Sequence, residues 1–212
     1  IGGGAFFGCD CLTTLSIGSG LTSVGLGAFY NCPNLTTVYC NMSKISADLF
    51  GGLYGYSYYS NNAALVILGD NVTSIDTDAF LYCYELRKIF IPKSVMEIEN
   101  SAFKNCTNLA IVEYGGSQED WEQVYIGDNN DNLLNAQINY NSLAEDAALT
   151  DTDLLTYTIN DNGTITITNC YENAVDIDIP AEINGMPVTA INSSAFANRA
   201  KLESVTIPSS VT

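Results

Sequence analysis

The residues of this chain that could do chemistry are its cysteines and its clustered carboxylates, because the sequence contains no histidine. Histidine is the usual general base, the usual activator of a nucleophilic Ser or Cys, and the commonest metal ligand. Neither the nucleophile pattern GxSxG nor the phosphate-binding pattern GxxxxGK[ST] occurs. The sequence therefore predicts no catalytic residue and no enzymatic activity.

Seven cysteines are present, and four of them recur at a fixed position, namely Cys9, Cys32, Cys83 and Cys106. Zinc ligands converge from closely clustered positions, whereas these four are spread along the chain. We interpret them as small buried thiols in a packing column. Most of the thiols are expected to be free, which thiol titration after denaturation would test.

Two acidic segments have residues that could form a metal site or a catalytic carboxylate pair. The first resembles the start of a calcium loop, with Asp128, Asn130 and Asn132. Its sixth position is Leu133 where the loop needs Gly, and its twelfth is Asn139 where it needs Glu, so calcium is not expected there. The second is a set of neighbouring carboxylates, Glu119, Asp120 and Glu122. Side chains at adjacent positions point in different directions, so these carboxylates cannot flank the bond of a substrate and are expected to lie on a solvated surface. We predict no metal and no cofactor for this chain.

Composition narrows the possible partners. Seven Lys and Arg oppose 24 Asp and Glu, and the net charge of -17 disfavours nucleic acid and anionic membranes. No apolar run is long enough to span a bilayer, so no membrane insertion is expected within this sequence. Ile1 begins no signal peptide and Thr212 ends within a repeat, so we interpret the chain as a piece of a longer product.

A repeat of 23 residues organises the chain. The dipeptide Ala-Phe recurs at this interval from Phe6 to Phe29 and from Phe80 to Phe103, and once more at Phe196. Counted from each Phe, position +6 is Leu in all five copies, and position -5 is Ile or Val. Stacked coils of a repeat protein share one core and place like residues in ladders. We therefore expect the Phe, Leu and Ile columns to be buried.

Positions +9 and +11 are also apolar, which indicates a strand with one face in the core. Position +9 holds Leu15, Val38, Ile89, Val112 and Val205, and position +11 holds Ile17, Cys40, Ile91, Tyr114 and Ile207. The prediction is a curved, right-handed, β-rich solenoid with short helical turns at Ala-Phe.

Breaks in the repeat suggest the domain organisation. A degenerate copy at Phe50 is followed by an insertion within residues 51–62. After Tyr114 the repeat stops, and residues 115–140, with the single Trp121, are predicted to cap a first array over 1–140. Residues 141–153 are small and acidic and suggest a linker. Residues 154–212 begin with a predicted hairpin at Tyr157–Ile167, around Asn-Asp-Asn-Gly, and start a second array.

These columns resemble the BspA-like leucine-rich repeats of bacterial surface proteins, as do the pattern Ala-Phe-x-x-Cys-x-x-Leu and the residues Ile98 and Ile191 at position -5. The resemblance covers nearly all of the chain. It implies an α/β-type leucine-rich-repeat solenoid and a secreted or cell-surface location, with adhesion to a host or matrix protein or a glycan. It supplies no catalytic residues.

The candidate ligand-binding surface combines a strand row with the insertion. Position +10 points away from the core, so Ser16, Tyr39, Ile67, Phe90 and Glu113 should line up along one exposed face. Its apolar members, Tyr39, Ile67 and Phe90, either pack on one another or on the insertion, or bind a ligand. The insertion carries Tyr54, Tyr56, Tyr58 and Tyr59 among Gly, Ser and Asn, a composition that recognition loops favour.

The expected function is a non-catalytic binding or adhesion module for protein or glycan. Two alternatives remain open at this point. The chain could be a passive spacer that displays other domains, as its two arrays and short linker suggest. It could also be an accessory domain of a larger surface enzyme.

Overall fold

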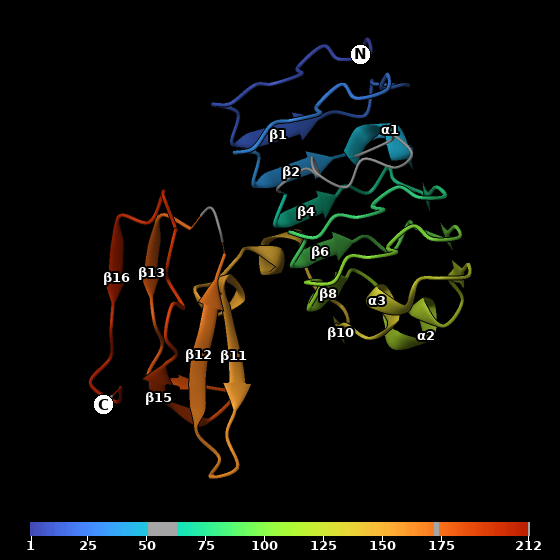
Figure 1. The fold of residues 1–212 in the computed structure, drawn as a ribbon. Coiled ribbons are helices and arrows are strands. Elements are labelled where there is room, and N and C mark those ends of the chain that lie inside the picture. Colours follow the sequence, from blue (N-terminus) through green and yellow to red (C-terminus); the bar gives the residue numbers. More distant parts are fainter. Residues whose placement is uncertain (51–62, 172–173, 212) are drawn as a thin grey trace. The chain divides into compact units, whose positions relative to one another are not determined.

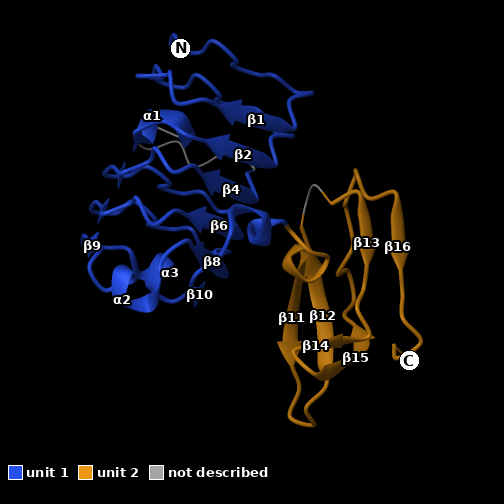
Figure 2. Ribbon diagram, turned by 180° about the vertical axis from the view of Figure 1, so that it is seen from behind, with its two compact units in different colours: residues 1–148 blue, residues 149–212 orange. Residues whose placement is uncertain are grey.

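The computed structural model describes residues 1–50, 63–171 and 174–211. The described residues form two compact units, residues 1–148 and 149–212 (Figure 2). The sequence suggested a separate linker over residues 141–153. In the structure, residues 141–148 belong to the first unit.

A parallel sheet, here called the main sheet, forms one side of the first unit (Figure 1). Its strands in spatial order are β1 (Thr14–Ile17), β2 (Thr37–Cys40), β4 (Leu65–Leu68), β6 (Lys88–Ile91), β8 (Ile111–Tyr114) and β10 (Gln137–Asn139). Like positions of successive coils pair directly, so that Leu15 lies opposite Val38 and Ile89 lies opposite Val112. The expected strands at positions +9 and +11 are confirmed in these coils.

A second parallel sheet, here called the minor sheet, contains the apolar residues at position -5 of the repeat. Its strands are β3 (Lys44–Ile45), β5 (Ser74–Ile75), β7 (Glu97–Ile98) and β9 (Tyr125–Ile126). Ile45, Ile75 and Ile98 are each fully buried. They belong to one core cluster with the inward residues of the main sheet, so each coil buries its apolar side chains between the two sheets.

The chain turns at Ala-Phe between the minor and the main sheet. Phe29, Phe80 and Phe103 are buried as predicted, and the rings of Phe80 and Phe103 stack with their centroids 4.8 Å apart. Phe6 is 41% exposed, so the prediction of burial is wrong for this residue. Its ring stacks on that of Phe29, with the centroids 5.0 Å apart. Phe196 is half-buried, so the prediction of burial is wrong for this residue as well.

The described Ala-Phe turns are mostly not helical. They are hydrogen-bonded turns, and the short helix α1 (Ala47–Phe50) forms at the degenerate copy. In the five regular copies, the residues two before and two after Phe have positive φ, at Gly4, Gly8, Gly27, Asn31, Asp78, Tyr82, Ser101, Asn105, Ser194 and Asn198. Gly and Asn tolerate this left-handed conformation best. Tyr82 is the one aromatic residue with positive φ in the described part of the chain.

The cysteine column packs beside the Phe turns. The Cys32 thiol donates to the Phe6 carbonyl oxygen at 3.2 Å, and the Cys106 thiol donates to the Phe80 carbonyl oxygen at 3.0 Å. Burial raises the pKa of Cys32 and raises the pKa of Cys106 to about 12. All seven cysteines lie in the described residues, and none of them forms a disulfide bond there. The buried thiols of Cys32 and Cys106 serve as small apolar groups that each donate one hydrogen bond.

A cap covers the last coil of the first unit. Its helices are α2 (Gln118–Trp121) and α3 (Asp131–Leu134). Ser117 begins α2 in a reciprocal capping arrangement with Asp120, a common way to satisfy the free N–H groups of a first turn. Trp121 is buried and packs edge-on against Tyr114, with ring centroids 4.9 Å apart.

Asn130 accepts the last of the hydrogen bonds that the Phe N–H groups donate from coil to coil. The Phe80 N–H donates to the Ala102 carbonyl oxygen of the next coil at 2.7 Å. The Phe103 N–H instead donates to the Asn130 side-chain oxygen at 2.9 Å. The Asn130 side-chain nitrogen donates to the carbonyl oxygens of Glu99 and Gly127, both at 2.9 Å. The side chain thus replaces the backbone that a further coil would supply.

The second unit begins with the short 3-10 helix η2 (Thr152–Leu154) and the antiparallel hairpin of β11 (Leu155–Ile159) and β12 (Ile165–Cys170), as predicted. β15 (Met186–Ile191) joins this sheet parallel to β12, and β14 (Glu182–Ile183) pairs with β15. β13 (Asp176–Asp178) and β16 (Ser204–Thr206) form a separate parallel pair. Ile207 follows β16 and is exposed, so the expected inward position of this residue is wrong.

Candidate binding surface

The predicted row lies on the outward face of the main sheet. The strand pairing places Ser16 beside Tyr39, Tyr39 beside Ile67, Ile67 beside Phe90 and Phe90 beside Glu113. These residues line up because each stands at position +10 of its coil, or at the equivalent position of β4. The alignment expected from the repeat is confirmed.

The exposure of the row falls sharply from β2 to β8. Tyr39 is 43% exposed, Ile67 is half-buried, and Phe90 is 6% exposed. Glu113 is buried as well. The expectation of one continuous exposed face is therefore wrong for Phe90 and Glu113, and Phe90 has little surface left for a ligand.

The cover over this face is the segment 141–148, here called the strap. It contains the 3-10 helix η1 (Ala144–Ala147), which packs on β4, β6 and β8. Ala147 is fully buried at this contact, and the Lys88 ammonium donates to the Ala148 carbonyl oxygen at 3.2 Å. The strap packs over the less exposed part of the row, and the burial of Ala147 stabilises this contact.

Glu113 fastens the beginning of the strap to the main sheet. Its carboxylate accepts hydrogen bonds from the Ser142 hydroxyl at 2.8 Å and from the Asn139 side-chain nitrogen at 3.1 Å. A buried carboxylate must be hydrogen-bonded, and these donors satisfy it. We interpret Glu113 as a structural residue of the strap contact.

The insertion lies outside the described residues, and with it the candidates Tyr54, Tyr56, Tyr58 and Tyr59. Its two flanks are described. Phe50 is buried against Phe80 in the turn column, with ring centroids 4.6 Å apart. Ala63 is buried just before β4, where the neighbouring coils have Leu35 and Leu86. The insertion is therefore attached at the turn side of its coil, and neither attachment point belongs to the outward row.

The acidic residues of the cap are engaged in local contacts. The Asp120 carboxylate pairs with the Lys93 ammonium at 2.8 Å, and this contact, with the Ser117 N–H, lowers the pKa of Asp120. Hydrogen bonds from its own backbone and from Ser117 lower the pKa of Glu119. Within residues 1–50, 63–171 and 174–211, no three Cys, Asp or Glu side chains converge as metal ligands would.

A family model for the BspA type leucine rich repeat region matches this chain in six copies, over residues 1–110, 52–178 and 134–212. The matches together cover the whole chain. The chain belongs to the BspA-type leucine-rich-repeat family. No helix among the described residues of this BspA-type chain has the length and apolar character needed to cross a membrane.

Solved structures with a similar fold include two bacterial proteins. A leucine rich cell surface protein from Faecalibacterium prausnitzii is 20% identical, with a TM-score of 0.39, and the match covers 100% of this chain and 65% of that one. A leucine-rich repeat protein from Eubacterium ventriosum is 16% identical, with a TM-score of 0.33, over 94% of this chain and 49% of that one. The BspA-type chain thus spans only part of each. No curated protein matches it.

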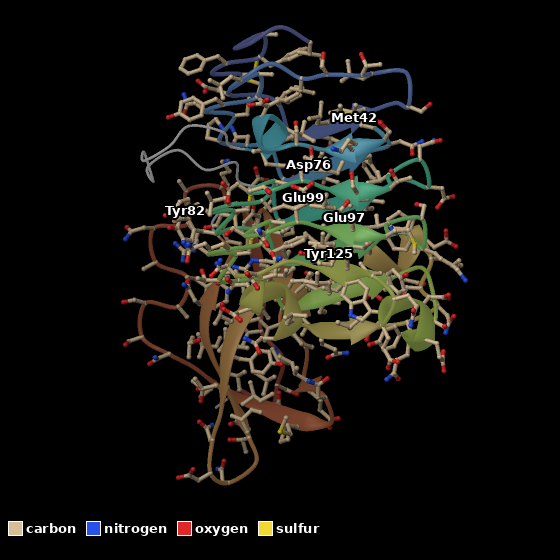
Figure 3. The ribbon with its side chains drawn as sticks, turned by 90° about the vertical axis from the view of Figure 1, so that its right-hand side faces the viewer. Met42, Asp76, Tyr82, Glu97, Glu99 and Tyr125 are labelled. Carbon is tan, nitrogen blue, oxygen red and sulfur yellow. The ribbon has the colours of Figure 1, made fainter. Side chains whose placement is uncertain are left out.

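A pair of tyrosines on the turn side of the BspA-type solenoid was missed in the sequence. Tyr82 is 38% exposed, and its ring lies 5.8 Å from that of Tyr84, at an angle of 44°. Figure 3 shows Tyr82 at the side of the solenoid, away from Asp76, Glu97 and Glu99 on the face of the minor sheet. The signal was Tyr at position +2, where the other regular copies have Gly or Asn.

Proposed function

We propose that this chain is a non-catalytic binding and display module at the bacterial cell surface, which recognises a protein or a neutral glycan. Family membership supports the surface location and a binding or display role. The observation that carries the proposal is the uncovered end of the main sheet, where Tyr39 is exposed beyond the strap.

The chemistry of this uncovered end suits neutral ligands. Tyr39 stands beside Ser16, and Thr14 and Thr37 pair with each other on the same face, two positions earlier. An aromatic ring among hydroxyl groups provides stacking and uncharged hydrogen bonds. The net charge of -17 disfavours anionic ligands.

The absence of histidine and the engagement of the cap carboxylates support a non-catalytic role. The buried carboxylate of Glu113 is likewise held by two donors. General acid-base chemistry needs a titrating group within reach of a substrate, and these carboxylates have structural partners instead.

Screening the full chain against extracellular-matrix proteins and a glycan array tests this proposal. For a ligand found in this way, Tyr39→Ala should weaken binding by about 1 to 3 kcal/mol, the usual scale for an aromatic anchor. Tyr125→Ala, which removes an exposed tyrosine from the minor sheet, is the matched control and should bind like the parent.

A double variant, Tyr56→Ala with Tyr58→Ala, examines the insertion separately. If this variant alone loses the ligand, the insertion is the binding surface and the main-sheet face is not. A passive spacer is the second candidate, favoured by the two compact units in tandem. It predicts that no ligand is retained by the full chain in either screen.

A further inference from the structure

We propose that Tyr82 and Tyr84 form a second binding site, on the turn side of the solenoid, for the sugar rings of a neutral glycan. This site is separate from the main-sheet face proposed above. The argument begins with the backbone of Tyr82, which has a φ of 61°. In the other regular copies this position holds Gly8, Asn31, Asn105 and Asn198.

The left-handed conformation is unfavourable for a bulky residue, because its Cβ approaches the following carbonyl oxygen. Gly avoids this contact and Asn tolerates it, which explains the residues in the other copies. Tyr82 keeps the same turn geometry, and its N–H donates to the Lys104 carbonyl oxygen at 3.0 Å. The turn itself therefore gains nothing from tyrosine over asparagine.

Core packing compensates for this strain only in part. The side chain of Tyr82 is 38% exposed, in contrast to the fully buried Phe80 two residues earlier. A strained residue that stays partly exposed is a reason to look for a functional role. The exposed ring is what tyrosine adds at this position.

The two rings form a tilted aromatic pair, in which Tyr82 is the more exposed ring and Tyr84 is half-buried. Their centroids are 5.8 Å apart with an angle of 44° between the planes. The Asn108 side-chain nitrogen donates to the Tyr84 carbonyl oxygen at 2.6 Å, and the Tyr84 N–H donates to the Tyr82 carbonyl oxygen at 2.8 Å, so the backbone is held in place. Rigid aromatic groups lose little entropy when they bind a ligand.

The ligand class follows from this surface. The apolar C–H face of a sugar ring stacks on an aromatic ring, and tyrosine hydroxyl groups can hydrogen-bond to sugar hydroxyls. Among the described residues, neither tyrosine hydroxyl has a hydrogen-bond partner, so both are available. The side chains of Asp78 and Glu85 belong to the same turn, and they, with the net charge of -17, disfavour acidic sugars.

Isothermal titration calorimetry on the full chain tests the proposal with neutral hexasaccharides of glucose, mannose, galactose and N-acetylglucosamine, and with an acidic hexasaccharide of galacturonate. At least one neutral hexasaccharide should bind. Tyr82→Asn should weaken that binding about tenfold, a typical loss for one aromatic anchor. Tyr84→Ala should weaken it similarly.

Tyr82→Asn also has a stability readout that distinguishes binding from packing. Since asparagine suits positive φ, the variant should unfold about 2 to 4 °C higher than the parent. A lower unfolding temperature would show that Tyr82 serves the fold, and the proposal would be overturned. It would also be overturned if no neutral hexasaccharide binds, if galacturonate alone binds, or if Tyr82→Asn binds like the parent.

An exposed tyrosine elsewhere provides a matched control. Tyr125→Ala should leave hexasaccharide binding unchanged, because this residue lies on the minor sheet. Tyr39→Ala tests the main-sheet face separately. If Tyr39→Ala removes the binding and Tyr82→Asn does not, the main-sheet face is the glycan site and this second site does not exist. The failure of either proposal is thus separable from the failure of the other.

Discussion

Asn130 shows how a single side chain ends a repeat. A coil within the stack receives backbone hydrogen bonds from the next coil, and the last coil lacks this neighbour. The Asn130 amide supplies one acceptor and two donor bonds in place of that backbone, and the residue is 2% exposed. An amide carries both a carbonyl and an NH2 group, so it can make all three contacts at once.

Asn130→Ala should therefore be strongly destabilising. It leaves the Phe103 N–H and the Gly127 carbonyl oxygen unpaired in a buried site, whereas the Glu99 carbonyl oxygen keeps its bond from the Ala102 N–H. We expect the free energy of unfolding of the first unit to fall by about 2 to 4 kcal/mol. Denaturant unfolding followed by circular dichroism measures this change. Asn132→Ala, two residues further and half-buried, should stay within about 0.5 kcal/mol of the parent. Equal losses in the two variants would contradict the role of Asn130.

The strap is the element that decides which part of the main sheet a ligand can reach. Its helix η1 carries two alanines with opposite surroundings, because Ala147 is fully buried and Ala144 is exposed. The Ser142 N–H also donates to the Tyr114 carbonyl oxygen at 3.0 Å, which fixes the start of the strap on β8. The burial of Ala147 and the Lys88 contact hold its other end.

Ala147→Asp should detach the strap and leave the stacked coils folded. Burying an unpaired carboxylate in place of a methyl group costs several kcal/mol, more than such a short element gains from its contacts. Hydrogen exchange at residues 142–148 should accelerate in this variant and stay slow in Ala144→Asp, while the main-sheet amides of both remain protected. Equal exchange in the two variants would mean that Ala147 does not hold the strap.

Charge acts at the scale of the whole molecule. The net charge of -17 makes the average interaction between charged groups repulsive. Two described ion pairs oppose this repulsion, Lys44 with Asp76 and Lys93 with Asp120. Their lysines are largely exposed, and such pairs contribute about 1 kcal/mol or less each. Repulsion should therefore outweigh attraction in dilute buffer.

Salt should accordingly stabilise this protein. Raising the ionic strength from about 0.01 to about 0.15 M shortens the screening length from about 30 to about 8 Å and weakens long-range repulsion most. The thermal unfolding temperature should rise by a few degrees over this range, as scanning calorimetry would show. Sucrose at equal osmolality should not reproduce the whole effect. A fall in unfolding temperature with salt would show that the ion pairs dominate.

The sequence by itself determined the coil and its neighbours. The recurrence of the Ala-Phe turn predicted the burial of Phe29, Phe80 and Phe103, and the alternation around Ile89 predicted β6 and its pairing with β8. These predictions succeed because a solenoid residue contacts its equivalents one coil away, so the same residue type recurs wherever the same environment recurs. The absence of histidine similarly limits the chemistry whatever the fold is.

The tertiary structure alone decided what covers the coils. Phe6 and Phe80 occupy the same repeat position, yet Phe6 is 41% exposed, whereas Phe80 is fully buried in contact with the rings of Phe50 and Phe103. Phe90 was expected to be exposed, but it is buried where the strap packs on the main sheet. The strap is an aperiodic segment that contacts strands far earlier in the chain, as the hydrogen bond between Lys88 and Ala148 shows. Periodicity encodes contacts between successive coils, whereas the path of an aperiodic segment depends on the burial and hydrogen bonds available on the finished surface.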